Sequence, residues 1–184
     1  MDTPAAHPTP LSRRLLGALL PFVIAIGVAL TLQATVGRLY EVHQSSMEQT
    51  LQPGDILFGE KITPRFGSLT YGDIVVFTID RGPVPGEALI KRVVGLPGDE
   101  LRIADGVLYR NGEPLFEPYT YSQSGRTEPL TTDDHWTIPA GELFVMGDHR
   151  DGSTDSRVFG PVAIAEVEAR VLFRAVPLSG VDAP

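Results

Sequence analysis

The feature that most constrains this chain is a run of 22 residues without a formal charge, residues 15–36. A helix of that length rises about 33 Å, enough for the roughly 30 Å hydrocarbon core of a bilayer. Pro21 lies near the start of the run, where a helix tolerates proline better than at its centre. The run therefore predicts a transmembrane helix, and the alternative is the apolar core of a cleavable signal peptide.

The length of the run favours a retained anchor, because the apolar core of a cleaved signal usually has about 7–15 residues and a small-x-small site after it. Arg13 and Arg14 precede the run and Arg38 follows it, a bias that places the N-terminus in the cytoplasm. We therefore expect a cytoplasmic tail at 1–14, a single membrane span at 15–36 and an extracytoplasmic domain at 37–184. This organisation predicts a protein of the cytoplasmic membrane that contacts the lipid bilayer.

From residue 45 onward the sequence has the pattern of a mainly β domain. The chain contains 19 Gly and 16 Pro, and these residues separate short apolar segments, as turns separate strands. Asn111-Gly112 predicts a hairpin turn. Residues 116–135 lack periodicity and indicate an insertion or an exposed ribbon, and a single helical turn is expected near Ile164–Val167. The predicted strands are Ile56–Phe58, Ile74–Ile79, Ala88–Gly95, Leu101–Ala104, Val107–Arg110, Leu143–Met146 and Ala169–Val176.

Charge and composition exclude several classes of function. With 15 basic and 23 acidic residues the formal net charge is −8, which argues against nucleic-acid binding. The absence of cysteine excludes disulfides, a thiol nucleophile and thiolate metal sites. The zinc-protease motif H-E-x-x-H and the glycine-rich phosphate-binding motifs are missing, and residues 147–157 do not have EF-hand spacing. We therefore expect no cofactor and no metal.

Lys91 is one of only two lysines and lies in the middle of an apolar predicted strand. Neighbouring side chains of a strand face opposite sides, so Lys91 shares a face with Leu89 and Val93 and Arg92 does not. A lysine buried among apolar groups has a lowered pKa and can act as a general base, which arginine cannot. The alternative is a lysine whose amine reaches solvent from a strand end.

A general base needs a nucleophile, and without cysteine the candidates are Ser and Thr. Ser46 follows the end of the apolar run by ten residues, which reach at most about 35 Å, so it would lie near the membrane surface. The alternative is that Ser45-Ser46 is only a polar linker.

The stretch at 147–157 is dense in Asp, Arg, Ser and Gly. It is either a turn held together by an Asp155–Arg157 pair or the wall of a site in which Ser153 orients the amine. Spacing alone does not decide between them. A Ser-His-Asp triad could use His43, His135 or His149, but no G-x-S-x-G motif accompanies them and no one histidine stands out.

Taken together, these stretches resemble the type I signal peptidases, the membrane-bound Ser/Lys peptidases of bacteria. Four motifs occur in the family's order behind an apolar span, which makes the resemblance specific. They are Ser46-Met47 with Thr50-Leu51, Gly72 to Phe77, Lys91 to Asp99, and Gly147-Asp148 through Arg157.

The resemblance implies a largely antiparallel domain with two packed sheets, one of them against the membrane. It implies Ser46 as nucleophile, Lys91 as general base, and the main-chain N–H of Ser46 as part of an oxyanion hole. Ser153 would lie beside the amine, and Asp148, Asp155 and Arg157 would support the site. Small apolar subsites would be formed by Val42, His43, Gln44, Met47, Leu51, Leu89 and Ile90.

The chain departs from the family pattern at three positions. Gln49 replaces the usual Pro of the nucleophile motif, so this turn would be less rigid. Gly152 stands where Asn is usual and removes a side-chain hydrogen-bonding group. Gln44 occupies the position of a Ser that assists the oxyanion hole in some members, and its amide could donate there instead.

The resemblance implies a serine endopeptidase that removes signal peptides from exported preproteins after Ala-x-Ala-like sites. The alternatives are a specialised maturation peptidase of conjugative-transfer or pilus systems and a non-catalytic relative that binds preproteins. The sequence does not define an oligomeric state.

Overall fold

The computed structural model describes residues 11–83 and 85–176, with the backbone alone at 11–17, 32–34 and 176. Most of the predicted tail, residues 1–10, lies outside the described residues. The chain divides into two compact units, Met1–Val36 and Gly37–Pro184, which are described separately below.

The N-terminal unit is one helix, α1 (Leu11–Thr35). It begins four residues before the predicted span, so Pro21 lies within the helix instead of near its start. The side chains of residues 18–31 are all exposed, and most of them are apolar. Among the residues that the structure describes, no helix was found with the length and apolar character needed to cross a bilayer.

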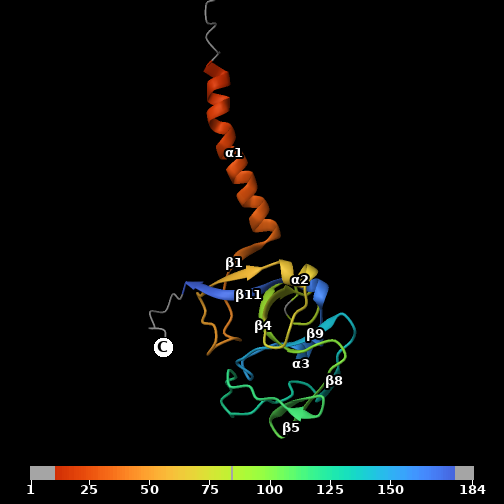
Figure 1. Ribbon diagram of the computed structural model, residues 1–184. Coiled ribbons are helices and arrows are strands. Elements are labelled where there is room, and N and C mark those ends of the chain that lie inside the picture. The colour runs from red at the N-terminus through yellow and green to blue at the C-terminus, as the bar shows by residue number, and fades with distance from the viewer. Residues whose placement is uncertain (1–10, 84, 177–184) are drawn as a thin grey trace, which may run out of the picture. The chain divides into compact units, whose positions relative to one another are not determined.

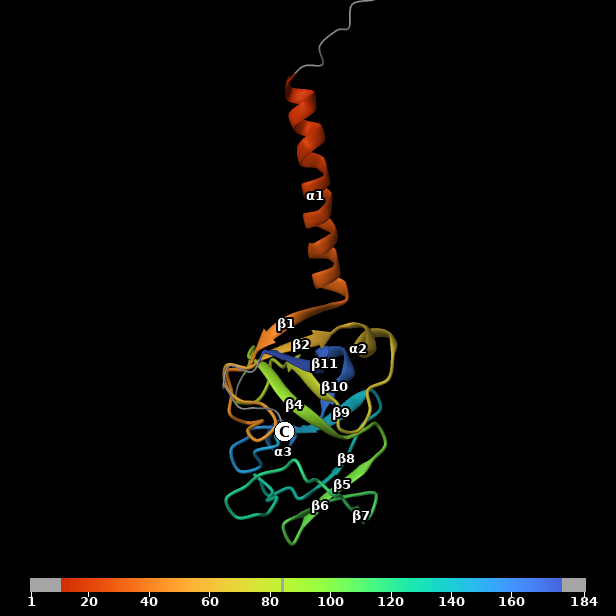
Figure 2. The same cartoon turned by 60° about the vertical axis from the view of Figure 1, so that its left-hand side comes forward.

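The second unit is mainly β, as predicted, and consists of two antiparallel sheets (Figures 1 and 2). The larger sheet has seven strands in the order β1-β2-β11-β3-β4-β9-β10. Their bounds are β1 (Gly37–Glu41), β2 (Ile56–Glu60), β11 (Val167–Val176), β3 (Ile74–Thr78), β4 (Ala88–Gly95), β9 (Glu142–Met146) and β10 (Val162–Ala163). Strand β4, which carries Lys91, lies inside this sheet between β3 and β9.

The smaller sheet has the order β7-β6-β5-β8, with β7 (Glu113–Pro114), β6 (Val107–Arg110), β5 (Glu100–Ala104) and β8 (His135–Thr137). Asn111-Gly112 turns the chain between β6 and β7 with positive φ at both residues, as an Asn-Gly hairpin turn requires. Short helices α2 (Ile62–Phe66), α3 (Ser156–Phe159) and the 3₁₀ turn η1 (Ile164–Glu166) complete the unit. Residues 116–134 contain no helix or strand, only an isolated bridge at Tyr121.

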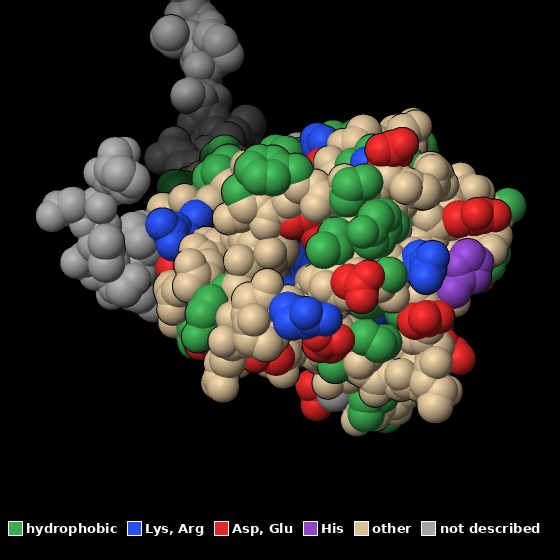
Figure 3. Space-filling view, turned by 90° about the horizontal axis from the view of Figure 1, so that it is seen from below, with side chains coloured by type: hydrophobic (Ala, Val, Ile, Leu, Met, Phe, Trp, Pro, Cys, Tyr) green, Lys and Arg blue, Asp and Glu red, His purple; other side chains and the backbone are tan. Residues whose placement is uncertain are grey.

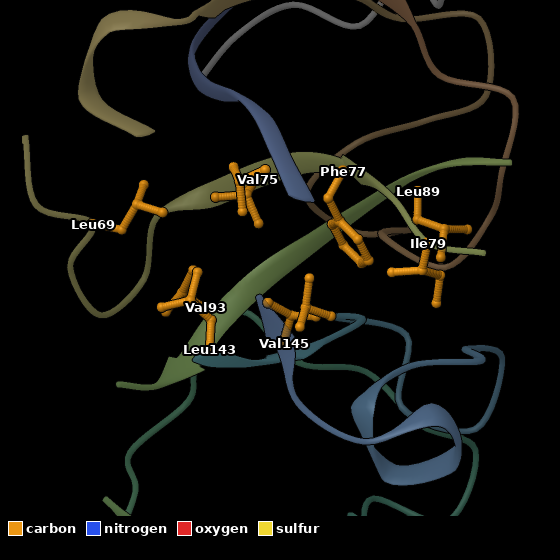
Figure 4. Packing of buried hydrophobic residues seen from close by; sticks show 10 residues of the cluster. Leu69, Val75, Phe77, Ile79, Leu89, Val93, Leu143 and Val145 are labelled. Carbon is orange, nitrogen blue, oxygen red and sulfur yellow. The ribbon is translucent and has the colours of Figure 1, made fainter. Parts of the chain in front are cut away.

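Three clusters of buried apolar side chains hold this unit together. The first joins strands β3, β4 and β9, where Val75, Val93 and Val145 point toward one another (Figure 4). The second includes side chains of β1 and β2 together with Met47, which follows Ser46 in the sequence. The third joins the two sheets, with Val94 and Phe144 from the larger and Leu101, Ile103 and Leu108 from the smaller. On the face in Figure 3, acidic and basic side chains are interspersed.

Candidate active site

Ser46 begins a tight turn between β1 and β2. The N–H of Leu51 donates to the Met47 carbonyl at 2.8 Å, and the N–H of Thr50 donates to the same oxygen at 3.0 Å. The buried Met47 side chain fixes the turn to the second cluster. Ser46 itself is buried, and its Oγ lies 2.6 Å from Lys91 Nζ.

Lys91 lies at the middle of β4, paired with Val75 of β3. Its side chain is only 1% exposed, so the alternative of an amine that reaches solvent is wrong. Burial lowers the pKa of Lys91 to about 8, with Asp155 raising it and Arg157 lowering it further. The amine donates to Ser46 Oγ and, at 3.3 Å, to the Ile90 carbonyl. When neutral, it has a lone pair available for the serine proton.

The Asp155–Arg157 pair connects the site to α3. Asp155 Oδ1 and Oδ2 accept from Arg157 Nε at 2.8 Å and Nη2 at 2.7 Å, and both side chains are buried. Asp155 Oδ2 also accepts from the Gly147 N–H at 3.0 Å. The pair therefore holds the end of β9 against the loop that carries Ser153. The stretch 147–157 is thus a turn held together by the Asp155–Arg157 pair, one of the two interpretations of its sequence.

Ser153 is buried next to Gly147. Its Oγ is buried, has no hydrogen-bond partner among the described residues, and lies against Gly147. A Cβ at Gly147 would overlap Ser153 Oγ and would lie 2.5 Å from the Ser46 carbonyl, so only glycine fits between them. No hydrogen bond joins Ser153 to Lys91 in the described part of the chain, and the hydroxyl is left with an unused donor and acceptor beside Ser46.

Asp148 and Arg92 support the turn that begins at Ser46. Asp148 accepts from Arg92 Nε at 2.9 Å and Nη2 at 2.6 Å, and from Thr50 Oγ1 at 2.5 Å. Arg92 and Lys91 thus have different partners, as the alternation of a strand requires. Arg150, buried and paired with Glu117 in a bidentate geometry, fastens the ribbon 116–134 to the same segment.

Two hollows meet at Ser46. The smaller, about 60 Å³, is mostly apolar, and the larger is an open cleft of about 340 Å³. His43, Gln44 and Ser46 line both. The smaller is further lined by Tyr40, Glu41, Val42, Met47, Val76, Ala88 and Ile90, and the larger by Ser45, Glu87, Leu89, Lys91, Gly152 and Thr154.

Six of the seven predicted substrate-binding residues therefore line one of these hollows. Leu51 does not, because it is buried in the second cluster beneath the turn. Tyr40 and Val76 were not predicted. The alternation of β1 could have indicated Tyr40, which shares a face with Val42, whereas Val76 comes from a strand distant in sequence.

The structure gives each departure from the family pattern a physical context. Gln49 has φ 82°, a left-handed conformation that proline cannot adopt, so the backbone of this turn excludes the usual proline. Gln44 Nε2 donates to the Ala88 carbonyl at 3.4 Å, and both residues line the smaller hollow. Gly152 lies under the His149 ring, which occupies the space of a side chain at 152. No cluster of three or more potential metal-ligating side chains occurs among the described residues.

Comparisons with known proteins identify one family. The model of the family "signal peptidase, peptidase S26" matches residues 15–176. A probable signal peptidase I-1 of Synechocystis is 35% identical over 162 residues, covering 85% of this chain and 80% of that protein. Signal peptidase I of Bacillus caldolyticus is 36% identical over 166 residues, covering 85% of this chain and 89% of that protein. A crystal structure of a signal peptidase I from Enterococcus faecalis is 35% identical, with a TM-score of 0.48, and covers 58% of this chain and 97% of that one.

A β domain in which a buried lysine amine meets a serine hydroxyl has the arrangement of a serine hydrolase with a lysine base. The family match and these identities show that the chain belongs to the signal peptidase family, peptidase S26. It is thus a serine endopeptidase, of a family whose activity is the removal of signal peptides.

Proposed function

We propose that Ser46 is the nucleophile and Lys91 the general base of this signal peptidase. The observation that carries the proposal is the 2.6 Å contact between Ser46 Oγ and Lys91 Nζ, both in buried side chains. With its pKa near 8, the Lys91 amine is partly neutral near pH 7, whereas an ordinary lysine is almost fully charged. A non-catalytic relative that only binds preproteins would not need this contact, so its presence argues against that alternative.

The reaction proceeds in two proton-coupled steps. Neutral Lys91 takes the Ser46 proton as Oγ attacks the scissile carbonyl, and the main-chain N–H of Ser46 donates to the developing oxyanion. One such donor is typically worth about 3–4 kcal/mol. Lysine then protonates the leaving amine, and an acyl-enzyme remains on Ser46. Water, deprotonated by Lys91, hydrolyses that ester and regenerates the serine.

The substrates we propose are preproteins that carry signal peptides ending in Ala-x-Ala-like sites. The support is the size and chemistry of the smaller hollow, about 60 Å³ and lined mainly by apolar side chains such as Val42, Met47 and Ile90. A methyl group fills a space of this size without the overpacking that a branched side chain would impose. Gln44 lies at the junction of both hollows, where its amide is available to a bound peptide.

We also propose that α1 anchors the protein in the cytoplasmic membrane, with residues 1–14 in the cytoplasm and 37–184 outside. The support is the uncharged run at 15–36 and the exposed apolar side chains along α1. Within the β domain, Leu39, Phe58 and Phe173 align across β1, β2 and β11, and Leu39 and Phe173 are each 56% exposed. Such a row of exposed apolar side chains is typical of a lipid-contacting surface.

Cleavage of a preprotein tests the catalytic proposal directly. The full chain in detergent is incubated with a preprotein containing an Ala-x-Ala site, beside Ser46→Ala and Lys91→Met. Lys61→Met, the exchange of the other lysine, is the matched control. Cleavage after the final Ala by the wild type and by Lys61→Met alone supports the proposal, and cleavage that survives Ser46→Ala refutes the assigned nucleophile. Protease protection of residues 37–184 in intact spheroplasts would refute the proposed topology.

A further inference from the structure

His149 lies beside the proposed site, but the mechanism above gives it no role. Its ring makes no hydrogen bond to Ser46 Oγ or to Lys91 among the described residues, so it is not the base of a Ser-His-Asp triad. Its main-chain N–H, however, donates to the Ser46 carbonyl at 3.1 Å. His149 therefore contacts Ser46 through its backbone, while its side chain contacts other groups around that turn.

The imidazole lies between two carboxylates on separate segments. Nδ1 is 3.3 Å from Glu48 Oε2, in the nucleophile turn, and 3.4 Å from the Ser45 carbonyl. Nε2 is 3.2 Å from Asp151 Oδ1. The second oxygen of Asp151 accepts from the Gln123 N–H at 2.8 Å, which fixes that carboxylate to the ribbon. The ring thus links the turn that begins at Ser46 to the segment that leads to Ser153.

Packing fixes the ring in this position. Tyr121 lies against one side, with ring centroids 5.1 Å apart. Gly152 lies on another side, and a Cβ there would be 2.5 Å from both Cε1 and Nδ1 of the ring. The titratable groups that face the imidazole are therefore Glu48, Asp151 and the Tyr121 phenol. An imidazolium donates to both carboxylates, while a neutral imidazole donates from one nitrogen only.

We propose that His149 is a positioning residue that holds the nucleophile turn, through Glu48, in the geometry that brings Ser46 Oγ to the Lys91 amine. This inference rests on the proposed function of Ser46 and Lys91. Tyr40, Val76 and Ile90, which line the smaller hollow, belong to β1, β3 and β4, whereas the polar partners of the ring lie outside these strands. We therefore expect loss of the ring to affect the chemical step more than substrate binding.

The kinetic test compares His149→Ala, His149→Gln and Glu48→Gln with His135→Ala, an exposed histidine of β8, as the matched control. Displacement of a reacting group by a fraction of an ångström predicts a fall in kcat of about tenfold for His149→Ala, with KM within about twofold. His149→Gln, which keeps one donor, retains part of the rate. Glu48→Gln lowers kcat as well, and the double variant loses no more than the larger single loss.

A second readout does not depend on cleavage. Because the chain has only two lysines, ¹³C-labelled lysine gives two Cε signals, which Lys61→Arg assigns. If the turn loosens and water reaches the amine, the Lys91 titration in His149→Ala moves from about 8 toward the ordinary lysine value, and in His135→Ala it stays. Thermal unfolding shows whether each variant is folded. If His149→Ala does not fold, the kinetic constants and the Lys91 titration of His149→Gln test the proposal instead.

Three results overturn the positioning role: an unchanged kcat together with an unchanged Lys91 titration, a raised KM with normal kcat, or additive losses in the double variant. A wild type that cleaves no preprotein refutes the proposed function, and the lysine titration still judges whether His149 holds the Ser46–Lys91 contact.

Discussion

The strongest prediction concerns the dependence of cleavage on pH. The buried Lys91 amine has its pKa lowered by desolvation to about 8, and Arg157 acts in the same direction while Asp155 opposes it. Only the neutral amine can accept the Ser46 proton. We therefore expect the rate of the chemical step to rise with pH through the pKa of this lysine and to level off above it.

The magnitude follows from this pKa. At pH 7 about a tenth of the enzyme carries a neutral Lys91, and at pH 6 about a hundredth, so the rate falls roughly tenfold for each unit below pH 8. An ordinary lysine, with a pKa near 10.4, would instead give a rate that is still rising at pH 9.5. The two cases differ by roughly two-hundredfold in neutral fraction at pH 7.

The assay is single-turnover cleavage of a preprotein between pH 5.5 and 9.5, with enzyme in excess so that product release does not limit the rate. Lys91→Arg, which stays protonated throughout, should show no cleavage at any of these pH values. Independence of pH between 6 and 9, or a midpoint near 10, would refute the reasoning that burial prepares this amine as a base.

Three further predictions concern stability. Lys91→Met should stabilise the fold at pH 7 by up to about 3 kcal/mol, because the folded state disfavours the charged amine while the unfolded chain does not. This gain in stability should shrink as the pH rises from 8 toward 10.5, where the amine loses its charge in both states. Urea unfolding at pH 7 and 10 measures it, and equal stability at pH 7 would contradict it. Gln49→Pro should destabilise the fold by about 2–3 kcal/mol, since proline cannot adopt φ 82°, whereas Gln49→Gly should be tolerated. If the proline variant has the same Tm as the wild type, residue 49 does not have this left-handed backbone conformation. Asp155→Asn should cost about 3–5 kcal/mol by leaving the buried Arg157 unpaired, and a loss under 1 kcal/mol in the same unfolding experiment would indicate that water reaches the guanidinium.

Local sequence patterns predicted much of the β domain. Two strands, Ala88–Gly95 and Val107–Arg110, occur with the predicted bounds, because Gly, Pro and Asn-Gly mark their ends unambiguously. Strands β1, β8 and β10 were not predicted. They have five, three and two residues, too few for the alternation of apolar and polar residues that predicts a strand.

Part of the candidate site was predicted from the sequence, and the rest depends on contacts that form only in the folded chain. The alternation of β4 predicted that Lys91 and Leu89 share a face, and both line the larger cleft. The choice of Ser46 over its neighbour Ser45 depended on family resemblance rather than on local pattern. His149 could not be distinguished from the other histidines, because its partners Glu48 and Asp151 belong to different segments of the folded chain.

By itself, the sequence determined the uncharged run, the β character of the chain from residue 45 onward and the residue types available for catalysis. These depend on composition and short-range periodicity, which need no knowledge of the fold. Only the tertiary structure decided that Lys91 is buried, that its amine lies 2.6 Å from Ser46 Oγ, and that Asp155 and Arg157 adjust its pKa. Desolvation and hydrogen bonding depend on distances between groups 45 or more residues apart in the chain, and packing of the sheets alone fixes those distances.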